Sequence, residues 1–302
     1  MISLEETLDL GRLDAVVSCP VCSSANISPV GKKLTIHPKA TSRFSIFSCD
    51  NCGHWSTDPL PQQDYLLQLY SEGSLSVYGA GWQKVVSEQF EAKTAEECLG
   101  KHGWIVDAER AREPGNYLEI GPGNCAVLRS FEAMNWKCHA IEPGSWSKDR
   151  PGFYDSIAQL PDVQFDVAVA NDVLEHVSDP RALLSEVSRV LKPGARFYSC
   201  FPNADSIRAR IQGTNWRMVR PIGHVHYFSK QSAAGLLKGC GYNVRMMRTY
   251  DLLIDLDLVE IARSLAHLRV KYACKTIADV MVSGTISALG AGDQWRVVAI
   301  RD

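Results

Sequence analysis

The sequence lacks the features of a membrane protein and of a secreted protein. None of its apolar runs approaches the roughly 20 residues that a helix needs to span a bilayer. Residues 1–14 are acidic, and they lack the basic start and apolar stretch of a signal peptide. We therefore expect the protein to be cytoplasmic.

A surplus of charge of one sign is also missing. The 302 residues carry a formal net charge of −2, and no block of Lys or Arg stands out. Proteins dedicated to nucleic acids usually show a basic footprint, so this balance argues against RNA or DNA as a partner. With 45% hydrophobic and 22% charged residues, the chain is typical of a globular protein. We expect a small-molecule partner.

Cysteine, in contrast, is abundant, and four of the ten cysteines form two C-x2-C pairs: Cys19, Cys22, Cys49 and Cys52. Two residues between thiolates let one tight turn aim both sulfurs at one ion, and Gly53 supplies the positive φ that such a turn tends to need. A reducing cytoplasm disfavours a disulfide, and the duplication disfavours a redox motif. The pattern predicts a structural zinc ion bound by the four cysteines. The other six cysteines are expected to be buried thiols.

Segments rich in Pro and Gly divide the chain into three parts. Residues 1–58 are expected to form a zinc ribbon, in which Phe44–Ser48 is a strand that delivers the second cysteine pair. Residues 59–101 are a linker and a helical segment, and 102–302 form the main domain with a helical insertion near 251–285. The insertion is expected to form a lid or a homodimer interface. We expect the ribbon and the main domain to have separate apolar nuclei.

A strand, a glycine turn and a helix open the main domain. Asn116–Ile120 reads as a buried strand, and Gly121 and Gly123 follow it before a helical pattern begins. Because glycines let the backbone approach a ligand closely, this unit is typical of a nucleotide cofactor site. The next strand ends at Glu142, whose carboxylate can accept hydrogen bonds from both ribose hydroxyls of an adenosine. These residues alone leave NAD open as an alternative.

Four segments follow one another through the main domain: LEIGPGNCAVL (118–128), IEP (141–143), FDVAVANDVLEHVSDP (165–180) and LKPGARFY (191–198). In this order and spacing they resemble the motifs of class I S-adenosylmethionine-dependent methyltransferases, and the resemblance covers roughly residues 82–302. It implies an α/β, Rossmann-like fold with a seven-stranded, mostly parallel sheet whose final strand, Gln294–Ile300, is antiparallel. One departure is Cys125, which stands where the family has its third motif glycine.

The same resemblance implies which residues bind S-adenosylmethionine. Glu119, Gly121 and Gly123 would line the methionine end, and Glu142 would bind the ribose. Residues 155–157 stand where the family has its adenine contacts, and Asn171 would close the site. The full expected set is Glu119, Gly121, Gly123, Asn124, Glu142, Pro143, Ser156, Ile157, Asn171 and Asp172.

Methyl transfer to a hydroxyl or a carbon acid also requires a general base. His176 is one candidate, since Glu175 and His176 are expected to open the helix after the third strand; a capping or packing role stays open for it. His224 and His226 lie in a stretch that resembles an H-x-H-x-F-S sequence common in methyltransferases of this type. Histidines at i and i+2 of an extended segment point to the same side. We expect at least one of this pair to be the base.

The nature of the acceptor follows from a second resemblance. A zinc ribbon ahead of a class I core resembles bacterial methyltransferases that act on nucleotide-linked or polymer-linked sugars. A sugar or sugar nucleotide, methylated on O or C, is therefore the first expectation. An rRNA or tRNA base methyltransferase is the alternative, because zinc ribbons often read RNA, and a non-catalytic assembly protein with the same fold is a third.

Overall fold

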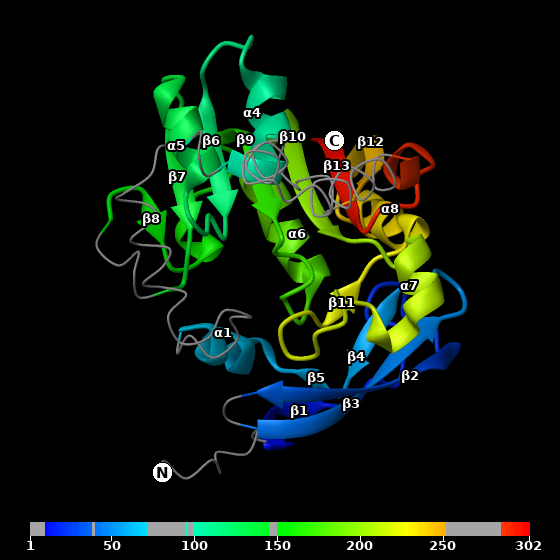
Figure 1. Ribbon diagram of the computed structural model, residues 1–302. Helices are drawn as coiled ribbons and strands as arrows, with labels where there is room; N and C mark the ends of the chain where they lie inside the picture. Colours follow the sequence, from blue (N-terminus) through cyan, green and yellow to red (C-terminus); the bar gives the residue numbers. More distant parts are fainter. Residues whose placement is uncertain (1–9, 38–39, 72–94, 96–98, 145–149, 252–284) are drawn as a thin grey trace, which may run out of the picture.

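The computed structural model describes residues 10–37, 40–71, 95, 99–144, 150–251 and 285–302. Within them a large seven-stranded sheet carries helices on both faces, and a smaller antiparallel sheet lies beside it (Figure 1). The helix expected between Trp82 and Lys101 and the insertion near 251–285 fall almost entirely outside the described residues.

The large sheet has the strand order β12-β13-β10-β9-β6-β7-β8. Strand β13 pairs antiparallel with β10 and β12, and the pairs from β10 to β8 are parallel. The expected mostly parallel sheet with an antiparallel final strand is therefore confirmed. Its strands are β6 (Asn116–Ile120), β7 (Lys137–Ile141), β8 (Phe153–Tyr154), β9 (Phe165–Asn171), β10 (Leu191–Pro202), β12 (Tyr242–Tyr250) and β13 (Gln294–Arg301).

The side on which the chain adds successive strands to this sheet changes between β6 and β9. From β6 the chain moves outward to β7 and β8, and it then returns to β9 on the other side of β6. In open α/β sheets, ligands bind outside the carboxyl ends of the strands at such a switch point. The glycine turn that follows β6 and Asn171 at the end of β9 both lie at this edge.

Helices cover the two faces of the sheet because the central strands bury side chains on both. Successive residues of β9 alternate between two buried clusters, with Ala168 in one and Val169 in the other. One face packs against α4 (Gly103–Glu109) and α5 (Ala126–Ala133), and the other against α6 (Pro180–Val190) and α8 (Lys230–Gly239). The remaining described helices are η1 (Leu10–Arg12), α1 (Gln63–Ser71), η2 (Gly100–His102), η4 (Ile157–Gln159), α7 (Ile207–Gln212) and η5 (Gly213–Asn215).

Helix α6 begins at Pro180. The side chain of Asp179 accepts a hydrogen bond from the Ala182 amide at 2.9 Å, and Pro180 occupies the first helical position. An Asp cap followed by Pro at the first position is a strong helix start. Glu175 and His176 therefore lie in the turn between β9 and α6, and the expectation that they open the helix is wrong.

The N-terminal segment forms the small sheet, in the order β11-β4-β3-β2. Strand β11 comes from the main domain, and its two residues His226 and Tyr227 pair antiparallel with Ser56 and Trp55 of β4. Figure 1 shows yellow β11 beside blue β4. The elements of this region are β1 (Leu13–Asp14), β2 (Ile27–His37), β3 (Ala40–Cys49), β4 (Trp55–Asp58), β5 (Leu60–Pro61) and β11 (His226–Tyr227).

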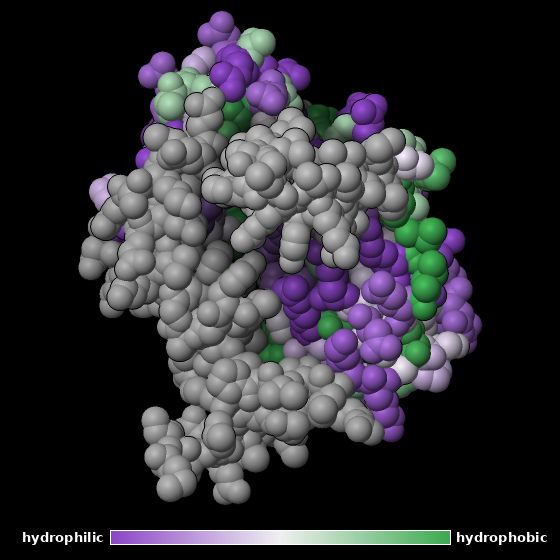
Figure 2. Space-filling model, in the orientation of Figure 1, coloured by the Kyte–Doolittle hydropathy of each residue, from purple (hydrophilic) through white to green (hydrophobic). Residues whose placement is uncertain are grey.

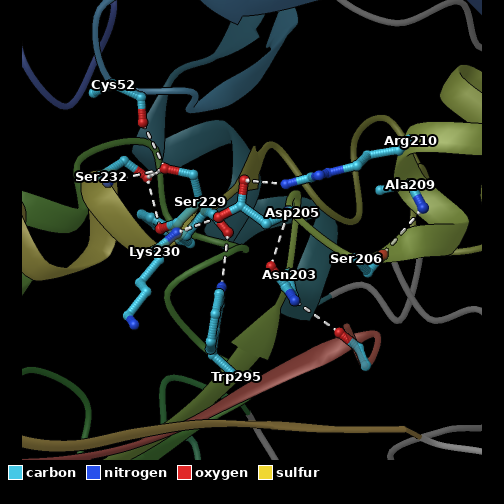
Figure 3. Close-up of polar contacts among 12 residues, drawn as sticks. Cys52, Asn203, Asp205, Ser206, Ala209, Arg210, Ser229, Lys230, Ser232 and Trp295 are labelled. Atoms are coloured by element: carbon cyan, nitrogen blue, oxygen red, sulfur yellow. Dashed lines mark hydrogen bonds and ion pairs between the residues drawn. The ribbon is translucent and has the colours of Figure 1, made fainter. Parts of the chain in front are cut away.

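The two regions also share a buried nucleus. Cys19 and Cys52 belong to the same apolar cluster as Phe228 and Leu236 of the main domain. Ser229 strengthens the junction, because its hydroxyl donates a hydrogen bond to the Cys52 carbonyl at 2.5 Å (Figure 3). The expectation of separate apolar nuclei is therefore wrong, since the ribbon completes its core against the main domain.

The described surface is mostly hydrophilic on the face seen in Figure 2, where hydrophobic residues form only smaller groups. Val17, Ile211 and Leu289 are the most exposed of the large hydrophobic side chains described. Among the described helices, none combines the length and the apolar character needed to cross a lipid bilayer.

Candidate functional site

The turn after β6 has the backbone shape of a ligand cradle. Gly121, Gly123 and Cys125 all have positive φ, at 61°, 52° and 57°. A Cβ at Gly123 would meet no atom within 4 Å, so open space lies against this part of the turn. Cys125 takes the left-handed conformation that a glycine adopts more readily, which explains why the family motif has glycine there. Asn124 accepts a hydrogen bond from the Ala126 amide at 3.2 Å and so helps to start α5.

Glu119 lies in β6 directly before this turn, and its side chain is buried. The Tyr117 hydroxyl donates a hydrogen bond to one of its carboxylate oxygens at 2.9 Å. Burial raises the pKa of Glu119 to about 8, and the hydrogen bond from Tyr117 only partly opposes this. A buried carboxylate beside an open cradle is suited to a cationic ligand group, because the positive charge would favour its ionised form.

The expected ribose and adenine contacts lie together at the ends of β7 and β8. The Glu142 amide donates to the Tyr154 carbonyl at 2.9 Å, which places Glu142 close to the start of the 155–157 segment. The Glu142 carboxylate accepts a hydrogen bond from the Gly144 amide at 2.8 Å, and burial raises its pKa. Ser156 caps η4 through the Ala158 amide, and Ile157 is buried. Pro143 is exposed.

At the end of β9, two adjacent expected residues differ sharply in their partners. Neither polar atom of the buried Asn171 amide has a hydrogen-bond partner in the described structure. Asp172 has positive φ and is paired with Lys101, whose ammonium lies 2.7 Å from one carboxylate oxygen. Burial alone would raise the pKa of Asp172, but Lys101 and His102 outweigh it and hold the pKa well below its usual range. Asp172 is thus already neutralised by the protein, whereas Asn171 is suited to a ligand.

These residues fit S-adenosylmethionine. The open cradle at Gly123, the buried carboxylate of Glu119, Glu142 beside the 155–157 segment and the unpartnered Asn171 amide all lie at the carboxyl edge of the sheet. Buried polar groups rarely stay without partners unless a ligand or water supplies them. The protein therefore offers polar and negatively charged groups of the kind that a cationic adenosyl sulfonium would contact.

The three expected catalytic histidines separate into two places. The His176 and His224 rings are 4.8 Å apart and edge-to-face, whereas His226 contacts His54 of the ribbon. His176 Nδ1 lies 2.5 Å from the Gly223 carbonyl, and His224 Nδ1 lies 2.8 Å from the Met218 carbonyl. Burial lowers the pKa of His224 to about 3 and that of His226 to about 4. The expectation that His224 and His226 share one site is wrong.

His226 takes part in the junction between the ribbon and the main domain. Its Nε2 lies 3.2 Å from the Ser178 carbonyl, so this nitrogen carries the proton and donates it. Its Nδ1 then accepts a hydrogen bond from His54 Nε2, 3.1 Å away. Both ring nitrogens of a fully buried His226 are therefore used by the protein itself.

The four predicted metal ligands converge at the edge of the small sheet. Cys19 Sγ lies 3.7 Å from Cys52 Sγ, and Cys22 Sγ lies 3.6 Å from Cys49 Sγ. Tetrahedral sulfurs about 2.3 Å from a zinc ion lie roughly 3.8 Å apart, so the observed spacing fits that ion. Gly53 has the expected positive φ, and its amide donates to the Cys49 carbonyl at 2.7 Å. These cysteines could hold a metal without any further ligand.

Sequence reasoning missed two contributors to these sites. Lys101 neutralises Asp172 and also donates to Gln294, although it precedes the first motif by many residues. His54 directly follows Gly53, and its Nε2 contacts Nδ1 of a second buried histidine, His226. Its proximity to a second buried histidine could be found only in three dimensions.

A seven-stranded sheet with this order, combined with the glycine turn, the acidic residue after β7 and the open edge at β9, defines the class I S-adenosylmethionine-dependent methyltransferases. The family model described as "Methyltransferase domain" matches residues 94–246, about half of the chain. The protein belongs to this family and is an S-adenosylmethionine-dependent methyltransferase.

Individual relatives are distant. The ubiquinone biosynthesis O-methyltransferase of Hahella chejuensis is 27% identical over 100 residues, which are 33% of this chain and 40% of that protein. The chain thus matches well under two thirds of this relative's length. A chain of the complex between the Haloferax volcanii Trm112 methyltransferase activator and the putative methyltransferase aligns with 12% identity, a TM-score of 0.49, and coverage of 73% of this chain and 97% of that one. The Burkholderia thailandensis 1,6-didemethyltoxoflavin-N1-methyltransferase aligns with 14% identity, a TM-score of 0.46, and coverage of 85% and 95%.

Proposed function

We propose that this methyltransferase acts on a small molecule, with a sugar or sugar nucleotide as the first candidate and O or C as the methylated atom. The chain has a net charge of −2 and no basic block, which disfavours a nucleic-acid acceptor. The curated relative is named for O-methylation in ubiquinone biosynthesis, which is also small-molecule chemistry. The observation that carries the proposal is the open edge at Gly123 and Asn171, where the cofactor and a small acceptor can meet.

The cofactor site is assigned to the residues at that edge. Glu119 would pair with the cationic methionine end, Glu142 would accept hydrogen bonds from the ribose, and the Asn171 amide would supply a donor and an acceptor. Bound there, S-adenosylmethionine supplies a methyl group that is activated for displacement by its positive sulfur. The protein must then hold the acceptor atom roughly 3 Å from that methyl, opposite the sulfur.

The acceptor side is assigned to His176 and His224. The His176 ring, from the turn that follows Asn171 and Asp172, packs against the His224 ring, whereas His226 contacts His54 at the junction with the ribbon. With a pKa lowered to about 3 by burial, His224 is a poor proton acceptor on its own. Its proposed role is to orient the acceptor while neutral, and the acidity of the acceptor hydroxyl must be raised by another group.

The cysteine cluster is proposed to hold one structural zinc ion. Support comes from the sulfur spacing of 3.6 and 3.7 Å and from the amides of Val21 and Cys22, which hydrogen-bond to Cys19. Four thiolates leave no open position on a tetrahedral ion, so this site would stabilise the fold and take no part in methyl transfer.

An acceptor panel tests the proposed function. The purified protein is incubated with methyl-labelled S-adenosylmethionine and, separately, with nucleotide-linked sugars, catechols and tRNA. Label transfer to a sugar derivative, with a mass gain of one methylene unit, is the expected result. Transfer to tRNA alone would overturn the small-molecule assignment, and transfer to catechols alone would exclude a sugar as the acceptor.

A further inference from the structure

A second polar cluster lies in the turn between β9 and α6, away from the cysteines. Glu175 is completely buried there, and neither of its carboxylate oxygens accepts a hydrogen bond from another described residue. Its backbone carbonyl is fixed by the amides of Val225 and His226, at 2.8 and 3.3 Å. The backbone of Glu175 is therefore held in place by the segment that carries His224, while its carboxylate oxygens have no hydrogen-bond partner in another described residue.

The two histidines beside Glu175 are oriented by backbone carbonyls. The Gly223 carbonyl lies 2.5 Å from His176 Nδ1, and the Met218 carbonyl lies 2.8 Å from His224 Nδ1. Because a carbonyl can only accept, both Nδ1 atoms carry a proton, and Nε2 is the basic nitrogen of each neutral ring. Histidines that ligate metals almost always donate the other ring N–H to a carbonyl or carboxylate in this way.

Glu175, His176 and His224 each offer one ligand atom, and these atoms all lie within 4.8 Å of one another. Zinc ligands about 2.1 Å from the ion at tetrahedral angles lie roughly 3.4 Å apart, so small side-chain adjustments would close the set. Taking a carboxylate out of water without a partner is strongly unfavourable. The cluster thus places two imidazole rings beside a buried carboxylate that requires a positive partner.

We propose that Glu175, His176 and His224 bind one divalent metal ion, with Zn²⁺ favoured by the ligand types. Two imidazoles and one carboxylate match the three-ligand sets of catalytic zinc sites and of related transition-metal sites. Three protein ligands leave a coordination position open. The alternative occupant is a proton, since burial and the nearby Asp172 raise the pKa of Glu175 well above its usual range.

The open position gives the site a role, and that role rests on the proposed function. A hydroxyl oxygen of the acceptor bound to the metal would be more acidic. Its proton would leave to water, its oxygen lone pair would form the new bond to the methyl carbon, and the electrons of the broken carbon–sulfur bond would remain on sulfur. The metal would thereby compensate for the weak basicity of His224.

Metal content tests the site directly. Wild-type protein, Glu175→Gln and the surface control Glu186→Gln are purified without chelator, and the metal per chain is measured by mass spectrometry. We expect Glu175→Gln to contain one equivalent less than wild type, and Glu186→Gln to match wild type. Equal metal content in all three proteins would overturn the proposal and leave the proton as the occupant of the cluster.

Cobalt substitution provides a second readout in case Glu175→Gln does not fold. Protein loaded with Co²⁺ is compared with its His224→Asn variant, and circular dichroism reports whether the variant is folded. The expected result is a loss of the weak d–d bands of a nitrogen and oxygen site, with the thiolate-to-cobalt bands of the cysteines unchanged. Identical spectra would overturn the metal site. A second metal equivalent with no transfer to any sugar would leave this site standing and would contradict only the acceptor assignment.

Discussion

The cysteine cluster and the carboxyl edge of the large sheet differ in how completely the protein satisfies their polar groups. In the ribbon, four sulfurs already lie at a tetrahedral spacing, and local turns supply their hydrogen bonds. At the sheet edge, Asn171 and Glu175 are buried without partners. A site that its own chain completes stabilises the fold, whereas a site with unsatisfied buried groups is suited to binding something else.

The largest effect is expected from a substitution in the cysteine cluster of the ribbon. Cys52→Ser removes one of the four proposed zinc ligands, and structural zinc sites contribute about 10 kcal/mol or more to folding. Because Cys52 shares a buried cluster with the main domain, the whole chain should lose stability in one cooperative transition. Thermal unfolding monitored by circular dichroism measures this. Cys138→Ser, on β7, is the control and should change little. An unchanged main transition in Cys52→Ser would restore the idea of two separate nuclei.

The two buried histidines of residues 224–226 give the next largest contrast. His224→Ala removes a ring that is proposed to orient the acceptor, and it should lower the methyl-transfer rate by roughly 100-fold, the scale of the loss when reacting atoms are misplaced by about 1 Å. His226→Ala should lower thermal stability through the lost contacts with His54 and Ser178. The folded protein should nevertheless retain most of its turnover. A loss of methyl-transfer rate in His226→Ala without a loss of stability would show that His226 belongs to the active site.

A smaller effect is expected at Glu142, which is proposed to bind the cofactor at the sheet edge. Glu142→Ala removes the acceptor for two ribose hydroxyls and should weaken S-adenosylmethionine binding by roughly 1.5–3 kcal/mol, which is about 10-fold to 150-fold. Calorimetry measures the affinity, and Glu186→Ala on the surface of α6 is the matched control. Unchanged affinity in Glu142→Ala would remove this residue from the site.

The smallest effect is a pH dependence at Glu119. Its pKa is about 8 in the free protein, so most molecules carry a neutral Glu119 at pH 7. If a cationic cofactor requires the ionised form, its affinity should fall by up to about tenfold for each pH unit below 8 and level off above it. Calorimetry between pH 6 and 9 shows the trend, and Glu119→Gln should abolish it. A flat profile in the wild type would separate Glu119 from the cofactor charge.

Much of the fold could be predicted because its signals are local. The buried strands β6 and β9 appear as short apolar runs, and the positive φ of Gly53 follows from the cysteine turn beside it. The position of the final antiparallel strand came from the family resemblance. In each case neighbouring residues in the sequence carry the information.

The rest depends on contacts between distant residues. Strand β11 has only two residues, too few for a periodic pattern, and it is a strand because β4 pairs with it. The partnership of His54 with His226 joins residues 172 positions apart. Alternation along an extended segment placed both histidines on one side, but only His226 lies in strand β11, and His224, which precedes the strand, meets His176 instead.

The central claim is that the edge formed by β6 and β9 binds S-adenosylmethionine. Its most direct test is a calorimetric titration of the wild-type protein with S-adenosylhomocysteine, with NAD as the comparison and Asn171→Ala as the site variant. The account predicts micromolar affinity for S-adenosylhomocysteine, no binding of NAD, and weaker binding in the variant. Equal affinity for NAD, or unchanged affinity for S-adenosylhomocysteine in Asn171→Ala, would contradict it.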